Sequence, residues 1–288
     1  MNYRKWVRNR IVRRDRLGKI VNFSYNLYCK INAPFHKLPD FLIIGAEKCG
    51  TTSLFQYIIE HPDVYSGRGK EIYFFDKQYF KGIHWYKLFF PVKTKNIFQK
   101  NTMISGEATP RCLNHPLAPK RIKKIMPNVK LIVLLRNPID RAYSHYQMEH
   151  AYGRDKLSFE ESIRIENNRI QGEFQKMEED GTYYSPKFYW YSHLTSGIYW
   201  EQLERWFKYF PRKQFLIIQS EELFEKPSEV YNQALEFLGL HSHELKEYKK
   251  FRSREYEGIE KKEKQELEDF FRPHNEKLYQ MLGKKFSW

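Results

Sequence analysis

The sequence contains only three cysteines, Cys29, Cys49 and Cys112, among 288 residues. An odd and sparse set of thiols argues against a disulfide framework and suits a reducing compartment. None of the three has the spacing from a histidine or another cysteine that zinc sites use, so we expect no metal centre. These absences argue against a small disulfide scaffold and against a zinc-dependent domain.

Long apolar runs are missing as well. Nowhere do about 18 apolar residues follow one another, so we expect no transmembrane helix. The N-terminus is basic but lacks the apolar core of a signal peptide. We therefore expect a soluble, cytoplasmic protein that touches a membrane at most peripherally.

Positive charge is what the sequence has in excess. Fifty lysines and arginines against 35 acidic residues give a formal net charge of +15. This surplus predicts an anionic ligand or surface, and nucleic acid, acidic polysaccharide, anionic lipid and a charged nucleotide all satisfy it. With 41% hydrophobic residues, the chain can still bury a substantial core.

The first 38 residues differ from the rest in composition. Apolar side chains alternate there with basic ones, which are Arg4, Lys5, Arg8, Arg10, Arg13, Arg14, Arg16 and Lys19. We predict a basic N-terminal extension over 1–38 and a single domain over 39–288. The pattern favours a helix packed on the body of the protein, and an interfacial helix on an anionic membrane or polymer is the alternative.

From Pro39 onward, strand-like apolar runs alternate with segments of helical periodicity. The predicted strands are 41–45, 72–75, 103–106, 130–135 and 214–219. The predicted helices are 52–60, 117–125, 138–151, 158–169, 187–209, 228–238 and 261–281. We expect 151–185 to be a polar connection with one helix and 241–260 to be a charged loop. The alternation predicts an α/β fold with a P-loop-like central parallel sheet flanked by helices on both faces.

The loop after the first predicted strand has the features of a phosphate site. Gly45 and Gly50 keep the spacing of the glycines in the G-x-x-x-x-G-K-[ST] loop of nucleoside triphosphate enzymes. Thr51 stands where that motif has its lysine, and Lys48 lies inside the loop instead. A glycine loop between a strand and a helix directs backbone N–H groups and the positive helix end at an anion. We expect a phosphate site that is not built for ATP and Mg²⁺.

A second anion site is predicted where the strand 130–135 ends. Arg136 follows that strand, and Ser144 lies about two turns into the next helix. Because ligands bind outside the carboxyl ends of parallel strands, we expect Arg136 and the glycine loop to share one crevice. Taken alone, Arg136 could equally be an ion-pair residue that holds a loop. Paired with that loop, it favours a nucleotide phosphorylated at both ends of its ribose.

These two motifs resemble those of sulfotransferases that use 3′-phosphoadenosine 5′-phosphosulfate (PAPS). Residues 45–54 are similar to the family's 5′-phosphosulfate loop, and residues 135–144 to its 3′-phosphate motif. The resemblance covers nearly the whole chain from about residue 39. It is strongest to the branch of the heparan sulfate sulfotransferase domains and their bacterial relatives.

The resemblance implies a role for each motif residue. Lys48 would stabilise the departing 5′-phosphate, and Arg136 and Ser144 would bind the 3′-phosphate. The family's late loop over the nucleotide corresponds to Arg252 and Arg254, which would be further 3′-phosphate ligands. The residues that would hold the 5′-phosphate are Gly50, Thr51, Thr52, Ser53 and Leu54.

The acceptor side is implied by the segment that contains Glu71. Glu71 resembles the family's general base, although its residues alone favour a surface carboxylate paired with a neighbouring cation such as Lys70. Tyr73 and Asp76 match positions that line the acceptor, and His145 lies on the helix after Arg136, near the expected acceptor cleft.

Two departures from the family pattern leave the acceptor open. Tyr73 stands where glucosamine 3-O-sulfotransferases have a histidine, and Ala108 where they have a lysine. The resemblance therefore implies a sugar, a glycolipid or another hydroxyl acceptor, with an amine as the alternative.

Three other interpretations compete with a metal-independent sulfotransferase. A P-loop kinase-like enzyme needs the Gly-Lys-[Ser/Thr] sequence, which is missing here. A polyanion-binding or nucleic-acid-binding protein would use the net charge but would leave the ordered motifs unexplained, so we expect no specific nucleic acid partner. A catalytically silent nucleotide-binding scaffold is opposed by Lys48 and Glu71.

Overall fold

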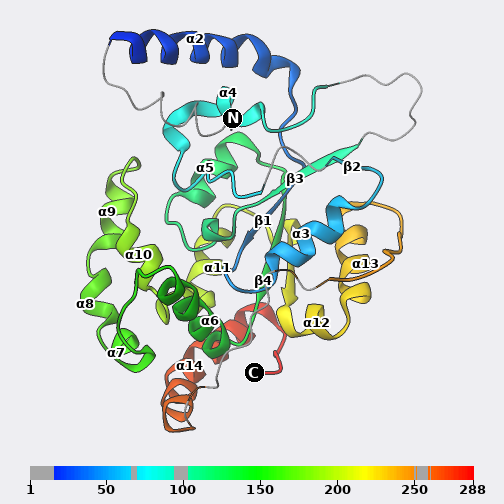
Figure 1. Cartoon of the computed structure of the whole chain (residues 1–288). Coiled ribbons are helices and arrows are strands. Elements are labelled where there is room, and N and C mark those ends of the chain that lie inside the picture. The colour runs from blue at the N-terminus through cyan, green and yellow to red at the C-terminus, as the bar shows by residue number, and fades with distance from the viewer. Residues whose placement is uncertain (1–15, 66–69, 94–102, 250, 252–258, 260) are drawn as a thin grey trace.

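A five-stranded sheet forms the centre of the protein (Figure 1). The computed structural model describes residues 16–65, 70–93, 103–249, 251, 259 and 261–288. The strand order is β2-β3-β1-β4-β5, and every neighbouring pair runs parallel. The strands are β1 (Phe41–Gly45), β2 (Val64–Tyr65), β3 (Ile104–Ala108), β4 (Lys130–Leu135) and β5 (Phe215–Gln219). The predicted parallel sheet is confirmed.

The two central strands owe their position to their apolar sequences. All five residues of β1 are buried, as are five of the six residues of β4. Phe41 pairs with Gly106 on one side and with Lys130 on the other. Gly106 carries no side chain where the ring of Phe41 lies across it, which allows this close approach. The sheet therefore has no solvent-exposed face at its centre.

Helices cover the sheet on both faces. Figure 1 shows α3 and α13 on one side of the strands and α5 and α11 on the other. The helices are α2 (Arg16–Asn32), α3 (Thr51–Ile59), α4 (Gly82–Lys87), α5 (Ala118–Ile125), α6 (Pro138–Ala151), α7 (Phe159–Arg164), α8 (Glu166–Ile170), α9 (Glu173–Glu179), α10 (Pro186–Tyr191), α11 (Tyr199–Phe207), α12 (Ser220–Glu225), α13 (Pro227–Leu238) and α14 (Lys261–Leu282). The α/β fold with helices on both faces is as the sequence predicts.

The predicted strand at 72–75 is wrong. Glu71 and Tyr73 have positive φ angles of 59° and 55°, which no strand residue adopts. Lys77 and Gln78 both donate their backbone N–H groups to the carbonyl of Tyr73, so the segment is a turn. The sheet edge is formed instead by the short strand β2, which the sequence pattern did not indicate.

The predicted helices 158–169 and 187–209 are each interrupted. Between α10 and α11, the backbone N–H groups of Leu194 and Thr195 donate to the buried carboxylate of Glu166. These donors bond a side chain rather than a helical carbonyl, so the chain turns there. Glu166 in turn begins α8, just after the break that follows α7. The polar connection 151–185 thus contains three helices, α7, α8 and α9, and not one.

The helix α2 is the described part of the basic N-terminal extension. It packs against α4 and leads through a single 3₁₀ turn, η1 (Ala33–Phe35), toward the start of β1. Residues 1–15, which carry most of the predicted basic pattern, lie outside the described residues. No helix in the described part of the chain has the length and apolar character needed to cross a membrane.

Candidate active site

The loop between β1 and α3 is shaped by two left-handed residues. Lys48 and Gly50 have φ angles of 72° and 80°. A Cβ atom at Gly50 would lie 3.0 Å from the ring of Phe224, so glycine suits this position on two grounds. Helix α3 begins directly after Gly50, and the first N–H groups of a helix have no partner within it. The loop therefore directs free backbone donors into the space in front of α3.

Neighbouring elements hold this loop in place. The backbone N–H of Ala46 donates to the carbonyl of Leu134 in β4 at 2.8 Å. The hydroxyl of Ser220, at the start of α12, donates to the carbonyl of Cys49 at 2.9 Å. The hydroxyl of Tyr199, in α11, donates to the carbonyl of Arg136 at 2.9 Å. Both anion-site segments are thus fixed by contacts from the C-terminal half of the chain.

A pocket of about 570 Å³ lies at the carboxyl ends of β1 and β4. It brings together the glycine loop, the segment around Glu71, and the residues Arg136 and Ser144, as the sequence predicts. The residues that line it are Glu47, Lys48, Gly50, Thr51, Thr52, Ser53, Lys70, Glu71, Tyr73, Pro110, Arg111, Arg136, Ser144, Met148, Tyr152, Phe224 and Phe251. Leu54 is fully buried in the core behind the loop.

Glu71 is held in this pocket by several contacts. Its backbone N–H donates to the carbonyl of Ala108, at the end of β3. The hydroxyl of Tyr73 donates to one carboxylate oxygen of Glu71 at 2.5 Å, and the ammonium of Lys70 lies 3.7 Å from the other. Lys70 also donates to the hydroxyl of Thr52 in the phosphate loop. The carboxylate is therefore linked through Lys70 to the loop where we expect the phosphate.

The pairing of Glu71 with Lys70, which the residues alone suggest, is present, but it is not a surface pair. The side chain of Lys70 is 12% exposed and that of Glu71 is 26% exposed. Burial, followed by the hydrogen bond to Glu71, raises the pKa of Tyr73 well above its ordinary value. Tyr73 thus keeps its proton and acts as a donor to Glu71 throughout the physiological range.

Arg111 also lines the pocket. Its Nε lies 3.4 Å from both carboxylate oxygens of Glu47, and one terminal nitrogen donates to the hydroxyl of Tyr184 at 3.1 Å. Burial alone would lower the pKa of Arg111, but Glu47 and the neighbouring tyrosines raise it above its ordinary value. Ala108 is fully buried and does not line the pocket, whereas Arg111, three residues later, supplies a cation to its lining.

The structure does not bring Asp76 or His145 to the pocket wall. Asp76 is 4% exposed, and burial raises its pKa to about 6. His145 is 1% exposed and lies behind Glu47 and Glu149, with its Nε2 4.0 Å from a carboxylate oxygen of each. Neither side chain lines the pocket, and their roles toward an acceptor stay predictions.

The comparisons with known proteins agree with this geometry. The Sulfotransferase domain family matches residues 38–280. The chain belongs to the sulfotransferase family. It is an enzyme that transfers sulfuryl groups.

Individual relatives give the same result as the family match. Membrane-associated sulfotransferase kil1 of Dictyostelium discoideum is 28% identical over 96% of this chain and 72% of its own length. Heparan sulfate glucosamine 3-O-sulfotransferase 3B1 of mouse is 31% identical over 88% of this chain, which spans 65% of that relative. A crystal structure of a sulfotransferase from Alicyclobacillus acidocaldarius matches with a TM-score of 0.66 and 28% identity, covering 87% of this chain and 98% of that one.

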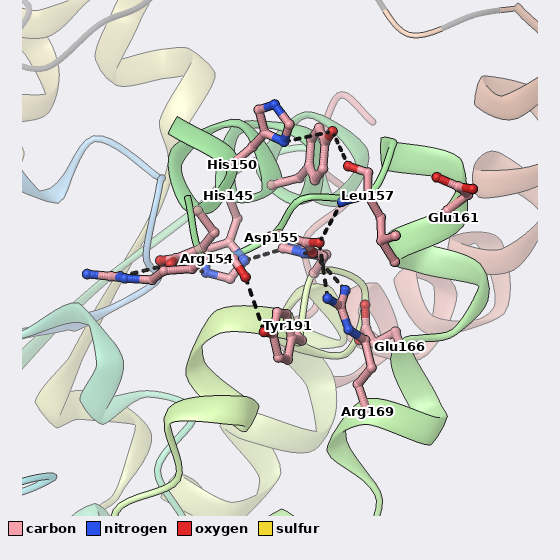
Figure 2. Close-up of polar contacts among 12 residues, drawn as sticks. His145, His150, Arg154, Asp155, Leu157, Glu161, Glu166, Arg169 and Tyr191 are labelled. Carbon is pink, nitrogen blue, oxygen red and sulfur yellow. Dashed lines mark hydrogen bonds and ion pairs between the residues drawn. The ribbon is translucent and has the colours of Figure 1, made fainter. Parts of the chain in front are cut away.

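Behind the pocket, this sulfotransferase has a buried polar cluster. Figure 2 shows Asp155 at its centre, with Arg169 and His145 extending toward it from different helices. Arg169 donates two hydrogen bonds to Asp155, at 2.8 and 3.1 Å, and the Nε2 of His193 lies 3.1 Å from the same carboxylate. The Nδ1 atoms of His145 and His193 are 2.8 Å apart, which requires one of them to be unprotonated.

The charges of this cluster follow from burial and pairing. Burial alone would raise the pKa of Asp155, but hydrogen bonds from His193 and Arg169 outweigh it and hold that pKa well below its ordinary value. Burial, together with the nearby cations and His193, holds the pKa of His145 well below its ordinary value, so His145 is neutral. The cluster therefore links α6, α8 and the turn after α10 through one buried carboxylate.

Several pocket residues were not anticipated from the sequence. Glu47 lies inside the phosphate loop itself, and Arg111 follows directly after the Thr-Pro pair at the end of β3. Glu47 and Arg111 both follow the end of a strand, and this position could have identified them as pocket residues. Phe251 could not be found in this way. Its backbone N–H donates to the hydroxyl of Ser53 at 3.1 Å, but the two residues are almost two hundred positions apart in the sequence. The predicted ligands Arg252 and Arg254 lie outside the described residues.

Carboxylates and histidines of the described chain do not gather into a metal-binding group. No set of three or more His, Cys, Asp or Glu side chains in that part of this sulfotransferase has the arrangement of a metal site. The three cysteines are buried and unpaired.

Proposed function

We propose that this sulfotransferase binds PAPS in the pocket and transfers its sulfuryl group to a hydroxyl of a carbohydrate or other small acceptor. The observation that carries the proposal is that the glycine loop, Glu71 and the pair Arg136 and Ser144 line one pocket. A mononucleotide would need only the loop. The second anion-binding pair, separated from the loop along the chain, supports a nucleotide with phosphates at two positions.

The residues present suit such a ligand. The donors at the start of α3, with the hydroxyls of Thr51 and Thr52, would hold the 5′-phosphate. Arg136 lies 4.0 Å from Asp140 and keeps 28% of its side chain exposed, so it can reach a 3′-phosphate together with Ser144. Phe224 and Phe251 supply apolar surface in the same pocket for a base.

The chemistry assigned to the protein is positioning and charge neutralisation. PAPS supplies the sulfuryl group, and 3′-phosphoadenosine 5′-phosphate is left. Lys48 would stabilise the negative charge that develops on the 5′-phosphate oxygen. Glu71 would accept the proton of the acceptor hydroxyl, while Tyr73 and Lys70 hold its carboxylate in one orientation. Arg111 and Glu47 would border the acceptor.

A sugar acceptor is favoured by two observations. The relatives include proteins named for heparan sulfate. The acceptor half of the pocket also alternates charged and aromatic side chains, which suits a ring carrying several hydroxyls; these are Glu47, Tyr73, Arg111 and Tyr152. Transfer to an amine is the second candidate, since a bifunctional N-deacetylase/N-sulfotransferase is also a relative.

Calorimetric titration without acceptor tests the donor assignment. We expect 3′-phosphoadenosine 5′-phosphate to bind much more tightly than 5′-AMP or ATP with Mg²⁺. The Arg136→Ala variant should lose on the order of 10- to 100-fold in affinity for the bisphosphate, because a charge-assisted hydrogen bond is lost. Its affinity for 5′-AMP should stay the same. A preference for ATP with Mg²⁺, or equal losses for both nucleotides, would contradict the proposal.

We propose that the enzyme acts in the cytoplasm, and the only support for this location is the state of its cysteine thiols. The cysteines Cys29, Cys49 and Cys112 are buried and unpaired, and this state is stable in a reducing compartment. Full sulfotransferase activity in a strongly reducing buffer is the expected result, and loss of activity there would count against it.

A further inference from the structure

The outward face of α2 is apolar and exposed. Leu27, Tyr28 and Ile31 lie on one side of the helix, at spacings of three and four residues, and are 47%, 55% and 59% exposed. Cys29 lies on the other side and is 3% exposed. The side of α2 that contains Cys29 therefore packs on the protein. The apolar side chains on the outward side are not needed for that packing.

The same exposed character continues beyond the end of the helix. Phe35 ends the 3₁₀ turn η1 with 61% of its surface exposed, and its carbonyl accepts a hydrogen bond from the backbone N–H of Lys93 at 2.6 Å. The neighbouring Val92 is 48% exposed. We refer to Leu27, Tyr28, Ile31, Phe35 and Val92 as the α2 patch. Exposed apolar side chains that gather in this way mark an interaction surface rather than isolated surface residues.

The part of the sequence that contains most of the α2 patch is strongly basic. Residues 1–39 contain ten lysines and arginines against the single acidic residue Asp15, which gives a formal charge of +9. Two lysines adjoin patch residues in the sequence and are exposed: Lys30 precedes Ile31, and Lys93 follows Val92. More than half of the net charge of +15 therefore belongs to the segment that contributes four of the five patch residues.

We propose that the α2 patch docks on an anionic lipid surface, with its apolar side chains among the acyl chains and the basic residues at the headgroups. Exposed aromatic and aliphatic side chains beside lysines and arginines are the combination that interfacial helices use. Each basic residue near such a surface adds attraction to anionic lipid. This inference is independent of the donor and acceptor assignments.

Other occupants fit the α2 patch less well. A second copy of the chain would bring two segments of charge +9 together, and like charges oppose that contact. A soluble polyanion would use the basic residues but would leave the apolar side chains in water. An anionic bilayer satisfies both the charge and the apolar surface.

Vesicle co-sedimentation tests the proposal. The full-length protein is mixed with vesicles of phosphatidylcholine alone or with one third phosphatidylglycerol, at low and physiological salt. We expect binding to the anionic vesicles, weakened by salt because surface charge is screened. The double variant Ile31→Gln and Phe35→Gln should bind at least tenfold more weakly. The matched control Phe270→Gln removes an exposed aromatic from α14, at the other end of the molecule in Figure 1, and should bind like the parent.

Each result decides between occupants. If the double variant binds anionic vesicles as well as the parent does, charge alone is responsible and the α2 patch is not inserted. If the parent sediments with neither vesicle but binds heparin, the occupant is a soluble polyanion. If light scattering shows a dimer that the double variant converts to a monomer, the occupant is a second copy. Each of these outcomes overturns the proposal. Thermal unfolding followed by circular dichroism reports the folding of all three proteins and should give equal midpoints.

Discussion

Glu71 is the residue whose role can be separated most cleanly from structure. In the Glu71→Gln variant the amide still accepts the hydrogen bond from Tyr73 but cannot take a proton. We expect turnover to fall by roughly 10²- to 10⁴-fold, the range for loss of a general base, with affinity for 3′-phosphoadenosine 5′-phosphate unchanged. Single-turnover assays and calorimetry measure the two quantities.

The control for this experiment is Glu160→Gln, which removes an exposed carboxylate from the first turn of α7. It should leave both turnover and nucleotide affinity at the parent values. If Glu71→Gln weakened the nucleotide as much as it slowed turnover, Glu71 would be a structural residue of the phosphate loop, acting through Lys70.

At the same scale, the sequence predicted the pocket residues that belong to local motifs. Lys48 and Gly50 could be predicted from the sequence because a phosphate loop needs glycine and a cation within a few positions. Glu47 and Arg111 form an ion pair although more than sixty residues separate them in the sequence. The sequence around each residue does not indicate which residue it pairs with. Tyr73 was placed on the acceptor side, but its hydrogen bond to Glu71 depends on two left-handed residues that the apolar pattern concealed.

At the scale of elements, strands and helices with uniform patterns were predicted within a residue or two. After Lys130 the strand β4 is an unbroken apolar run, and α6 starts at a proline that suits the first turn of a helix. The break between α10 and α11 was not predicted, because the backbone N–H groups there donate to Glu166, which lies almost thirty residues earlier in the sequence. Such a bond is invisible in a local hydrophobic pattern.

Asp155 holds these short helices together. It lies between α6 and α7, accepts two hydrogen bonds from Arg169 in α8, and contacts His193 after α10. In Asp155→Asn, the guanidinium of Arg169 loses its charged partner in a buried site. We expect the free energy of unfolding to fall by about 2–4 kcal/mol, measured by urea titration.

A second variant shows whether the charge is the cause. Asp155→Asn combined with Arg169→Met removes both members of the pair and should recover part of the lost stability, because no unpaired cation is left. If the double variant is less stable than Asp155→Asn by the full cost of a second independent substitution, the two residues are not coupled.

At the scale of the whole molecule, two buried carboxyl groups give stability a defined pH dependence. Burial raises the pKa of Glu107 to about 7 from its ordinary 4.5, despite hydrogen bonds from Thr109 and Tyr86, and raises that of Asp76 to about 6. Above the ordinary pKa the unfolded chain releases these protons first, so ionisation favours unfolding. The contribution of these two carboxyl groups to the free energy of unfolding should therefore fall from about pH 4 to pH 7 and then level off. The buried neutral histidines His115 and His145 contribute in the opposite direction, because burial lowers their pKa values and the unfolded chain takes up protons first as the pH falls.

The variant Glu107→Gln tests this dependence. Its amide resembles the protonated carboxyl group, so the part of the decline due to Glu107, on the order of 3 kcal/mol, should disappear while that of Asp76 persists. Denaturant titrations at pH 4.5 and pH 8 measure the difference. A variant whose stability changes between these two pH values by the same amount as the parent's would show that Glu107 ionises without cost.

The placement of α2 bears on which acceptors the enzyme can reach. Helix α2 leads into the start of β1, whereas the pocket is built from residues that follow the ends of β1 and β4. Strands of five or six residues separate the two by roughly 17–20 Å. A protein resting on a bilayer through α2 would thus hold its pocket at a distance from the lipid. A lipid-linked acceptor in the same leaflet would need a headgroup at least that long, which favours extended glycans and soluble molecules over short glycolipids.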